Sequence, residues 1–153
     1  MGISWQQNFT LTGLVEDKID RGVTALEQAL SDHKNTIYTN ALSGQDYKGD
    51  GLAPYSKKYA AKRIANRRSG SVDLTITGNM LGSMDYKVTE SGDSVIGEIY
   101  FRPVSSTAPK AFGGQSASAP EKAKNVSRKR PFFGISPAQV EEMQDKINEA
   151  MKG

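Results

Sequence analysis

Two stretches of the chain repeat apolar residues every three or four positions, which is the spacing of one face of an α-helix. The first runs from Leu11 to about Ala41, and Thr12 is placed to cap its start. The second follows Ser136, with Gln139 three residues later in the arrangement of a capping box. Because each pattern confines its apolar residues to one face, both helices are expected to pack on another part of the domain.

The region between these helices predicts β-structure. Apolar and polar residues alternate on both sides of Gly92, which predicts a β-hairpin over 86–101. Val95, Ile99 and Phe101 fall on one face of its second strand, since side chains alternate across a strand. We therefore expect an α+β fold in which a long N-terminal helix and a C-terminal helix pack on a small antiparallel sheet.

Two shorter elements precede the hairpin. Ser56 is placed to cap a helix from Lys57 to about Arg68, whose thin apolar face leaves a mostly basic surface toward solvent or a partner. Alternation over 74–77 predicts a short strand, which Gly78 ends before one helical turn over 79–84. A positive φ angle where the strand turns into this helix would explain the glycine.

Residues 103–129 are rich in Ser, Ala, Pro, Gly and Lys, and Phe112 is the only large apolar residue between Val104 and Val126. Ordering a backbone costs about 1–2 kcal/mol per residue, and this segment has too little apolar area to offset that cost within a monomer. We therefore expect a single domain over 1–153 with a long extended loop at about 103–129. The loop should be mobile alone and ordered against a partner.

The composition excludes several classes of chemistry. The chain has 153 residues and no cysteine, which excludes disulfides and thiolate catalysis. Its single histidine, His33, falls on the apolar face of the first helix as a packing residue. No nucleophile elbow, phosphate-binding loop or convergent acid pair occurs, so we expect no enzyme, no cofactor and no metal site. With no signal peptide visible and no apolar run near the roughly 20 residues that cross a bilayer, we expect no membrane contact.

The net charge of +3 is unevenly distributed along the chain. Two blocks are strongly basic: Lys57, Lys58, Lys62, Arg63, Arg67 and Arg68, and then Lys122, Lys124, Arg128, Lys129 and Arg130. The residues expected to form a basic surface on the first of these helices are Lys58, Lys62, Arg63 and Arg67. Such blocks attract nucleic acid or acidic protein surfaces, so a small basic nucleic-acid-binding protein is one reading of the chain.

Three segments in order carry a second reading. They are Leu-Thr-Ile-Thr-Gly-Asn-Met-Leu-Gly-Ser at 74–83, Ala-Phe-Gly-Gly at 111–114, and Arg-Pro-Phe-Phe-Gly-Ile-Ser at 130–136. Together with 52–59, this set resembles the phage virion morphogenesis (tail-completion) family, the Mu-type proteins of the tailed-phage neck and tail. The chain differs from the family's usual pattern at Lys110-Ala111, where a His-Gln pair often stands.

The resemblance implies a non-catalytic structural subunit that acts in tail completion or head–tail joining as part of an oligomeric ring. Its partners would be copies of itself and other phage neck, tail or head-connector proteins, with non-specific DNA contact where DNA passes through the ring. Such a subunit is assembled in the host bacterial cytoplasm and located in the virion.

The matching motifs nominate a set of interaction residues: Thr77, Gly78, Leu81, Ser83, Phe112, Gly113, Gly114, Arg130, Pro131, Phe132 and Phe133. Phe112, beside flexible glycines on a polar loop, is the best interface candidate among them. Of Phe132 and Phe133, we expect one to fill the core and the other to contact a partner.

Overall fold

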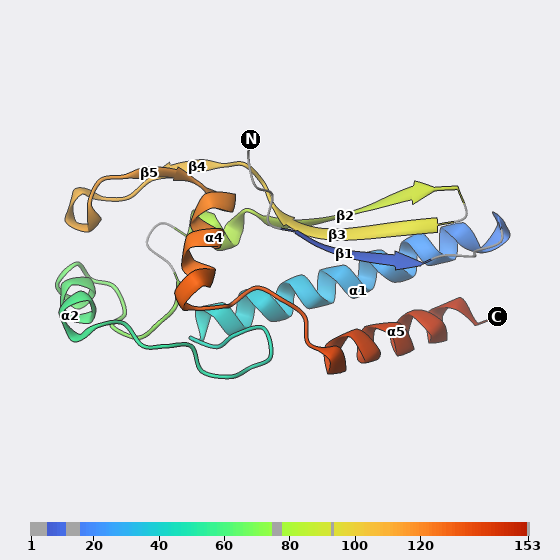
Figure 1. Ribbon diagram of the computed structural model, residues 1–153, viewed down its shortest axis with the longest axis horizontal. Coiled ribbons are helices and arrows are strands. Elements are labelled where there is room, and N and C mark those ends of the chain that lie inside the picture. The colour runs from blue at the N-terminus through green and yellow to red at the C-terminus, as the bar shows by residue number, and fades with distance from the viewer. Residues whose placement is uncertain (1–5, 12–15, 75–77, 93, 153) are drawn as a thin grey trace.

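A three-stranded antiparallel sheet and one long helix form the centre of the structure (Figure 1). The computed structural model describes residues 6–11, 16–74, 78–92 and 94–152. The sheet has the order β1-β3-β2, with β1 at Gln6–Leu11, β2 at Met84–Ser91 and β3 at Ser94–Phe101. Helix α1, Glu16–Leu42, lies along one face of this sheet. The α+β fold predicted from the sequence is confirmed.

The predicted hairpin is formed by β2 and β3, with Ser91 opposite Ser94 at the turn. Alternate residues of β3 face α1 and are buried, namely Val95, Gly97, Ile99 and Phe101. Their neighbours on the other face are partly exposed, as alternation across a strand requires. The shared face predicted for Val95, Ile99 and Phe101 is therefore confirmed.

Gly97 lets α1 approach the sheet closely. A Cβ atom at this position would lie 2.6 Å from Leu30 Cδ1 and 2.9 Å from Leu26 Cδ2. Both leucine side chains are fully buried, so they have little room to move away. The absence of a side chain at Gly97 is therefore a packing requirement of the α1–sheet interface.

The start of the predicted first helix is wrong. Leu11 lies in β1, opposite Val95, and α1 begins at Glu16. The predicted cap, Thr12, lies outside the described residues. Without β1, the edge of β3 opposite β2 would present unpaired N–H and C=O groups, and β1 supplies partners for them. The helical spacing around Leu11 carried no information about that long-range pairing.

The C-terminal helix α5, Pro137–Met151, is confirmed together with its cap. Ser136 Oγ accepts a hydrogen bond from the backbone N–H of Gln139 at 3.1 Å, and Gln139 Oε1 accepts one from the N–H of Ser136 at 2.9 Å. Met143 and Ile147 are buried in the core, and α5 packs along α1. No described helix is apolar over enough of its length to cross a bilayer.

The remaining elements gather at the other end of the molecule (Figure 1). Helix α2 at Lys57–Ala65 begins where predicted, with Ser56 as its N-cap, but ends short of Arg68. The predicted helical turn is α3, Asn79–Gly82. The short strand predicted at 74–77 falls mostly on residues outside the described part of the chain.

The segment predicted to be an extended loop contains regular structure. Strands β4 at Ser105–Thr107 and β5 at Ser116–Ser118 form a hairpin, which we call the arm, with a 3₁₀ turn η1 at Lys110–Phe112 near its tip. Helix α4, Ala119–Lys129, follows directly. The capping box of Ser118 and Glu121 begins α4, and burial of Ala119 and Ala123 holds it. Mobility of the arm in the isolated chain stays a prediction.

Replacement of Gly97 by alanine tests the close packing of α1 on β3. We expect Gly97→Ala to lower the free energy of unfolding by about 1–3 kcal/mol, the usual cost of overpacking a filled core. Urea denaturation followed by circular dichroism measures it. Gly82→Ala is the matched control, because no atom lies within 4 Å of a Cβ built there. Equal effects of the two substitutions would contradict the packing argument.

Candidate functional site

Residues 130–136 form the connection between α4 and α5, and both of their aromatic rings are buried. Phe132 is 0% exposed and Phe133 is 6% exposed. Their ring centroids lie 6.1 Å and 5.2 Å from that of Phe101 at the end of β3. The expectation that one of the two phenylalanines contacts a partner is therefore wrong. Both rings are buried in the core next to β3. Local sequence does not show that this core has room for two rings.

Gly134 continues this connection and sits against Tyr47. A Cβ atom at Gly134 would lie 2.7 Å from the Tyr47 ring, so any larger residue would have to displace that ring. The carbonyl oxygen of Gly134 accepts a hydrogen bond from His33 Nε2 at 2.8 Å. Gln139 Nε2 donates to the carbonyl oxygen of Tyr47 at 2.6 Å. Polar contacts thus tie the segment to α1 and to the loop before α2.

His33 is buried on α1, as its position on the apolar face predicted. Burial lowers its pKa below the usual value, and the hydrogen bond to Gly134 opposes this shift in part. The imidazole is therefore neutral in the folded chain near neutral pH. Within the described residues, no group of His, Cys, Asp or Glu is arranged to hold a metal ion.

Arg130 bonds within its own chain rather than extending to solvent. Its guanidinium donates to the carbonyl oxygens of Ala53 and Pro54 at 2.7 Å and 2.8 Å. It also lies 4.8 Å from the centroid of the Tyr55 ring, while Pro131 beside it is exposed. Arg130 thereby holds the loop that leads into α2. Because its hydrogen-bond partners are neutral carbonyl groups, its positive charge stays uncompensated.

The residues nominated around Gly78 do not form an exposed set. Gly78 is exposed and has φ +79°, which confirms the left-handed conformation expected at that junction. Leu81 and Ser83, however, are each only 2% exposed, so neither is available to a neighbouring subunit. The short helix α3 turns both side chains inward, and Ser83 Oγ donates to the carbonyl oxygen of Met80 at 2.8 Å. Thr77 lies outside the described residues.

Arg63 was expected on the basic surface and is instead buried, with 1% of its side chain exposed. Its guanidinium contacts Asp73 at 2.7 Å and the carbonyl oxygen of Ser69 at 2.7 Å. It stacks on Tyr55 and Tyr59, with ring centroids 4.9 Å and 5.9 Å away. The basic block contains no acid, so local sequence could not predict this pairing. The other three predicted surface residues, Lys58, Lys62 and Arg67, are exposed.

Phe112 lies near the tip of the arm and rests on α2. Its ring meets that of Tyr59 edge-on, with centroids 5.9 Å apart. Lys62 and Arg68 place their cationic groups 5.6 Å and 5.1 Å from its centroid. Since Phe112 is only partly exposed, its first role is to fix the arm on α2. Gly113 and Gly114 beside it are exposed, with φ of +101° and +62°.

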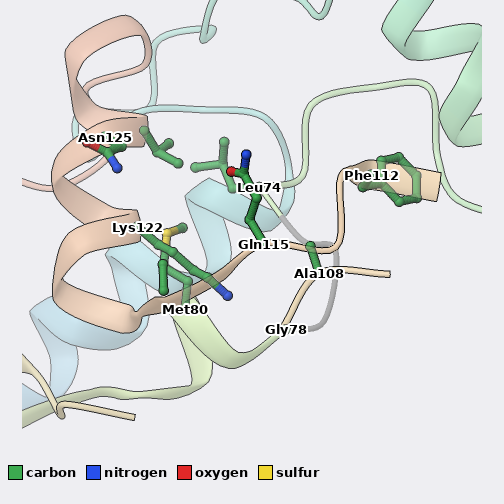
Figure 2. Close-up of a pocket in the computed structure, with 10 residues that line it drawn as sticks. Leu74, Gly78, Met80, Ala108, Phe112, Gln115, Lys122 and Asn125 are labelled. Atoms are coloured by element: carbon green, nitrogen blue, oxygen red, sulfur yellow. The ribbon is translucent and has the colours of Figure 1, made fainter. Parts of the chain in front are cut away.

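Two neighbouring cavities lie between the arm, α2 and α4, and we call them together the arm cleft. The first, about 300 Å³, has Lys122 and Asn125 of α4 on one side and Phe112 of the arm on the other (Figure 2). The second, about 430 Å³, is lined by tyrosines and cations: Tyr55, Tyr59, Arg63, Lys129 and Arg130. Leu74 and Val126 line both cavities. Burial raises the pKa of Tyr55, against the opposing charge of Arg63, so its phenol stays protonated.

The three nominated motifs converge on the arm cleft. Leu74 and Gly78 from the first motif and Phe112 from the second line one cavity, and Arg130 from the third lines the other. These residues are up to 56 positions apart in the sequence (74 to 130). The sequence identified each segment as a candidate for interaction. It did not predict that the segments lie together, because that depends on the fold.

Charge is divided between the two ends of the molecule. Residues 53–74 and 102–136, the basic end, hold 13 of the 20 Lys and Arg residues and 2 of the 17 Asp and Glu residues. The rest of the chain, the acidic body, holds the other 7 basic and 15 acidic residues. Figure 1 places α2, α4 and the arm toward one end, while most of α1, the sheet and α5 extend toward the other. The modest net charge therefore conceals a strong charge asymmetry.

Comparison with known proteins adds no assignment: no protein-family model, no curated protein and no solved structure matches the chain.

Replacement of Arg63 tests whether the buried ion pair holds α2. We expect Arg63→Ala to lower the free energy of opening of α2 by about 2–3 kcal/mol, because Asp73 loses a partner while part of its side chain keeps contact with water. Native-state hydrogen exchange over 57–65 measures this. Lys58→Ala, at an exposed position of the same helix, should change it by less than about 0.5 kcal/mol. Similar protection in the two variants would show that α2 does not depend on the pair.

The neutral His33 makes stability depend on pH in a defined direction. Because its folded pKa lies below the unfolded value of 6.5, its contribution is complete above that pH. As pH falls, the unfolded chain takes up the proton first, so stability decreases toward the lower folded pKa. Chemical denaturation at several pH values between about 7 and 5.5 should show this decrease. His33→Gln keeps an amide donor for Gly134 and should flatten the profile; an unchanged slope would exclude His33 as the cause.

Proposed function

We propose that this chain is a structural subunit of a tailed-phage virion that acts in tail completion or head–tail joining as part of an oligomeric ring. The observation that carries the proposal is the convergence of the three family-resembling motifs on the arm cleft. The segments that contain Leu74, Phe112 and Arg130 are far apart in the sequence, yet all three contribute to the two adjoining cavities of the cleft. A shared surface is the expected arrangement for motifs that serve one assembly contact.

The way in which the basic end is built supports a role in assembly. Helix α2 buries one arginine rather than an apolar stripe, and the arm contacts α2 through the ring of Phe112. Elements held by few apolar contacts belong to the less stable parts of a protein, which are often the parts that recognise a partner. A neighbouring subunit would bury more of Phe112 and of the cleft walls than the single chain does.

The acidic body explains why we prefer assembly to nucleic-acid binding as the main role. A protein that binds only DNA needs the basic end, and its remaining surface has no reason to be acidic. In an assembly, the acidic body has a use as the complement of the basic end. A subunit with both surfaces can make contacts with copies of itself.

A small basic nucleic-acid-binding protein stays the second candidate, and the density of positive charge at the basic end favours it. Exposed Lys58 and Lys62 on α2 would contact phosphate groups without sequence preference. Arg63 is not a useful position for testing this idea, because its substitution would also break the buried pair with Asp73.

Measurement of the oligomeric state tests the proposal. We expect the purified chain to form closed oligomers of uniform mass at about 0.1 M salt, where charge interactions still extend about 10 Å. Light scattering after gel filtration gives the mass, and negative-stain microscopy shows whether the particles are rings.

A chain that stays monomeric up to millimolar concentration would contradict the proposed function. If that monomer also retained a random DNA duplex, and Lys58→Glu with Lys62→Glu abolished the retention, the nucleic-acid function would take its place. A loss of affinity as salt rises would accompany such binding.

A further inference from the structure

We propose that copies of this chain join head to tail, with the acidic outer face of α5 of one copy bound in the arm cleft of the next. The inference rests on the proposed function for the existence of an assembly. It specifies which two surfaces meet, that the contact runs head to tail, and that opposite charges stabilise it.

The cleft is suited to an acidic ligand. Leu74, Met80 and Val126 give its walls apolar surface, while Lys122 and Lys129 supply positive charge. No described residue that lines either cavity is an Asp or a Glu. Lys122 contacts the hydroxyl and carbonyl oxygens of Ser106. These oxygens are neutral, so the positive charge of Lys122 stays uncompensated. The same holds for Arg130, whose partners are backbone carbonyls.

Helix α5 offers a surface of the complementary kind. Its inner face is buried on α1 through Met143 and Ile147, so its outer face is left to solvent. That face carries Glu141 and Asp145, which are both exposed. Two other acids of α5 already have a lysine partner. Glu142 pairs with Lys146 on the same helix, and Glu149 pairs with Lys152 directly after it.

Glu141 and Asp145 are the acids that remain for a partner. They are one helical turn apart and lie on the same side of α5. Within the described part of the chain, neither makes an ion pair. Two uncompensated acids therefore face outward on α5, and the arm cleft presents two lysines, Lys122 and Lys129.

The two surfaces cannot meet within one copy. Figure 1 places α5 at the end of the molecule away from α2 and the arm, so the contact needs a second chain. A two-fold dimer through the cleft would bring two basic ends together, and one through α5 would bring two acidic faces together. Repulsion opposes both arrangements. A head-to-tail contact pairs opposite charges, and repeated with rotation it closes a ring.

Charge reversal on each side separately provides the test. The first variant, Glu141→Lys with Asp145→Lys, makes the α5 face basic, and the second, Lys122→Glu with Lys129→Glu, makes the cleft acidic. All four positions are at least partly exposed, and circular dichroism checks that each variant folds. The control, Glu27→Lys with Glu90→Lys, makes the same change in net charge as the first variant, at exposed positions outside the proposed contact.

Either variant alone should need at least ten times the wild-type concentration for half-assembly, because it presents surfaces of like charge at both ends. An equimolar mixture of the two should assemble again, since each cleft then meets an α5 face of opposite charge. A chain that carries all four reversals should also assemble on its own. The control variant should assemble like the wild type.

The outcomes separate this inference from the proposed function. Assembly that is unaffected by either reversal, or that the mixture does not restore, would overturn the head-to-tail contact and leave the ring subunit standing. A wild-type chain that never assembles would overturn both. A cleft variant that assembles normally but loses binding to duplex DNA would assign the cleft to nucleic acid instead.

Discussion

The burial of Phe132 and Phe133 on Phe101 is the interaction on which the arrangement of the two ends depends. Full burial of a phenylalanine side chain contributes about 1.5–3 kcal/mol, so two adjacent rings make a strong attachment. They hold the connection between α4 and α5 against the end of β3. Gly134, the next residue, is held to α1 by the hydrogen bond from His33. Arg130, at the start of the connection, is held to the loop before α2 by its hydrogen bond to Ala53. The acidic body and the basic end are joined through these few residues.

The two ends are stabilised by different physical means. The acidic body has an apolar core of α1, α5 and the sheet, in which Leu26, Leu30 and Ile99 are fully buried. The basic end depends more on a buried ion pair, cation–π contacts and backbone hydrogen bonds, with Arg63 at their centre. These contacts bury Arg63 but leave Lys122 and Lys129 of the cleft at least partly exposed. The basic end therefore keeps an open, cationic cleft that the apolar body could not provide.

The sequence predicted the elements whose signals are local. The capping box at Ser136 and the alternation through Val95 and Ile99 each contain their own evidence, and both elements were found where expected. Strand β1 was missed because its pairing with β3 is a long-range contact. Helix α4 was missed because it lies in a segment rich in Ser, Ala, Pro and Lys. Its local signals, the Ser118–Glu121 capping box and a proline in the first turn, were overlooked there.

The candidate site was predictable only as separate segments. Sequence identified the segments at Gly78, Phe112 and Arg130, but their meeting around one cleft comes from the fold. Arg63 was misplaced because its partner Asp73 lies ten residues away, beyond the basic block. Phe132 and Phe133 were misplaced because sequence alone does not give the size of the space below β3.

Cross-linking of the assembled protein tests the central claim most directly. A carbodiimide joins only amines and carboxylates that are already in contact, and a mixture of ¹⁴N-labelled and ¹⁵N-labelled chains distinguishes links between copies from links within one. The account predicts mixed-isotope links that join Lys122 or Lys129 to Glu141 or Asp145. Links between copies that consistently connect other surfaces, with none between the arm cleft and α5, would contradict it.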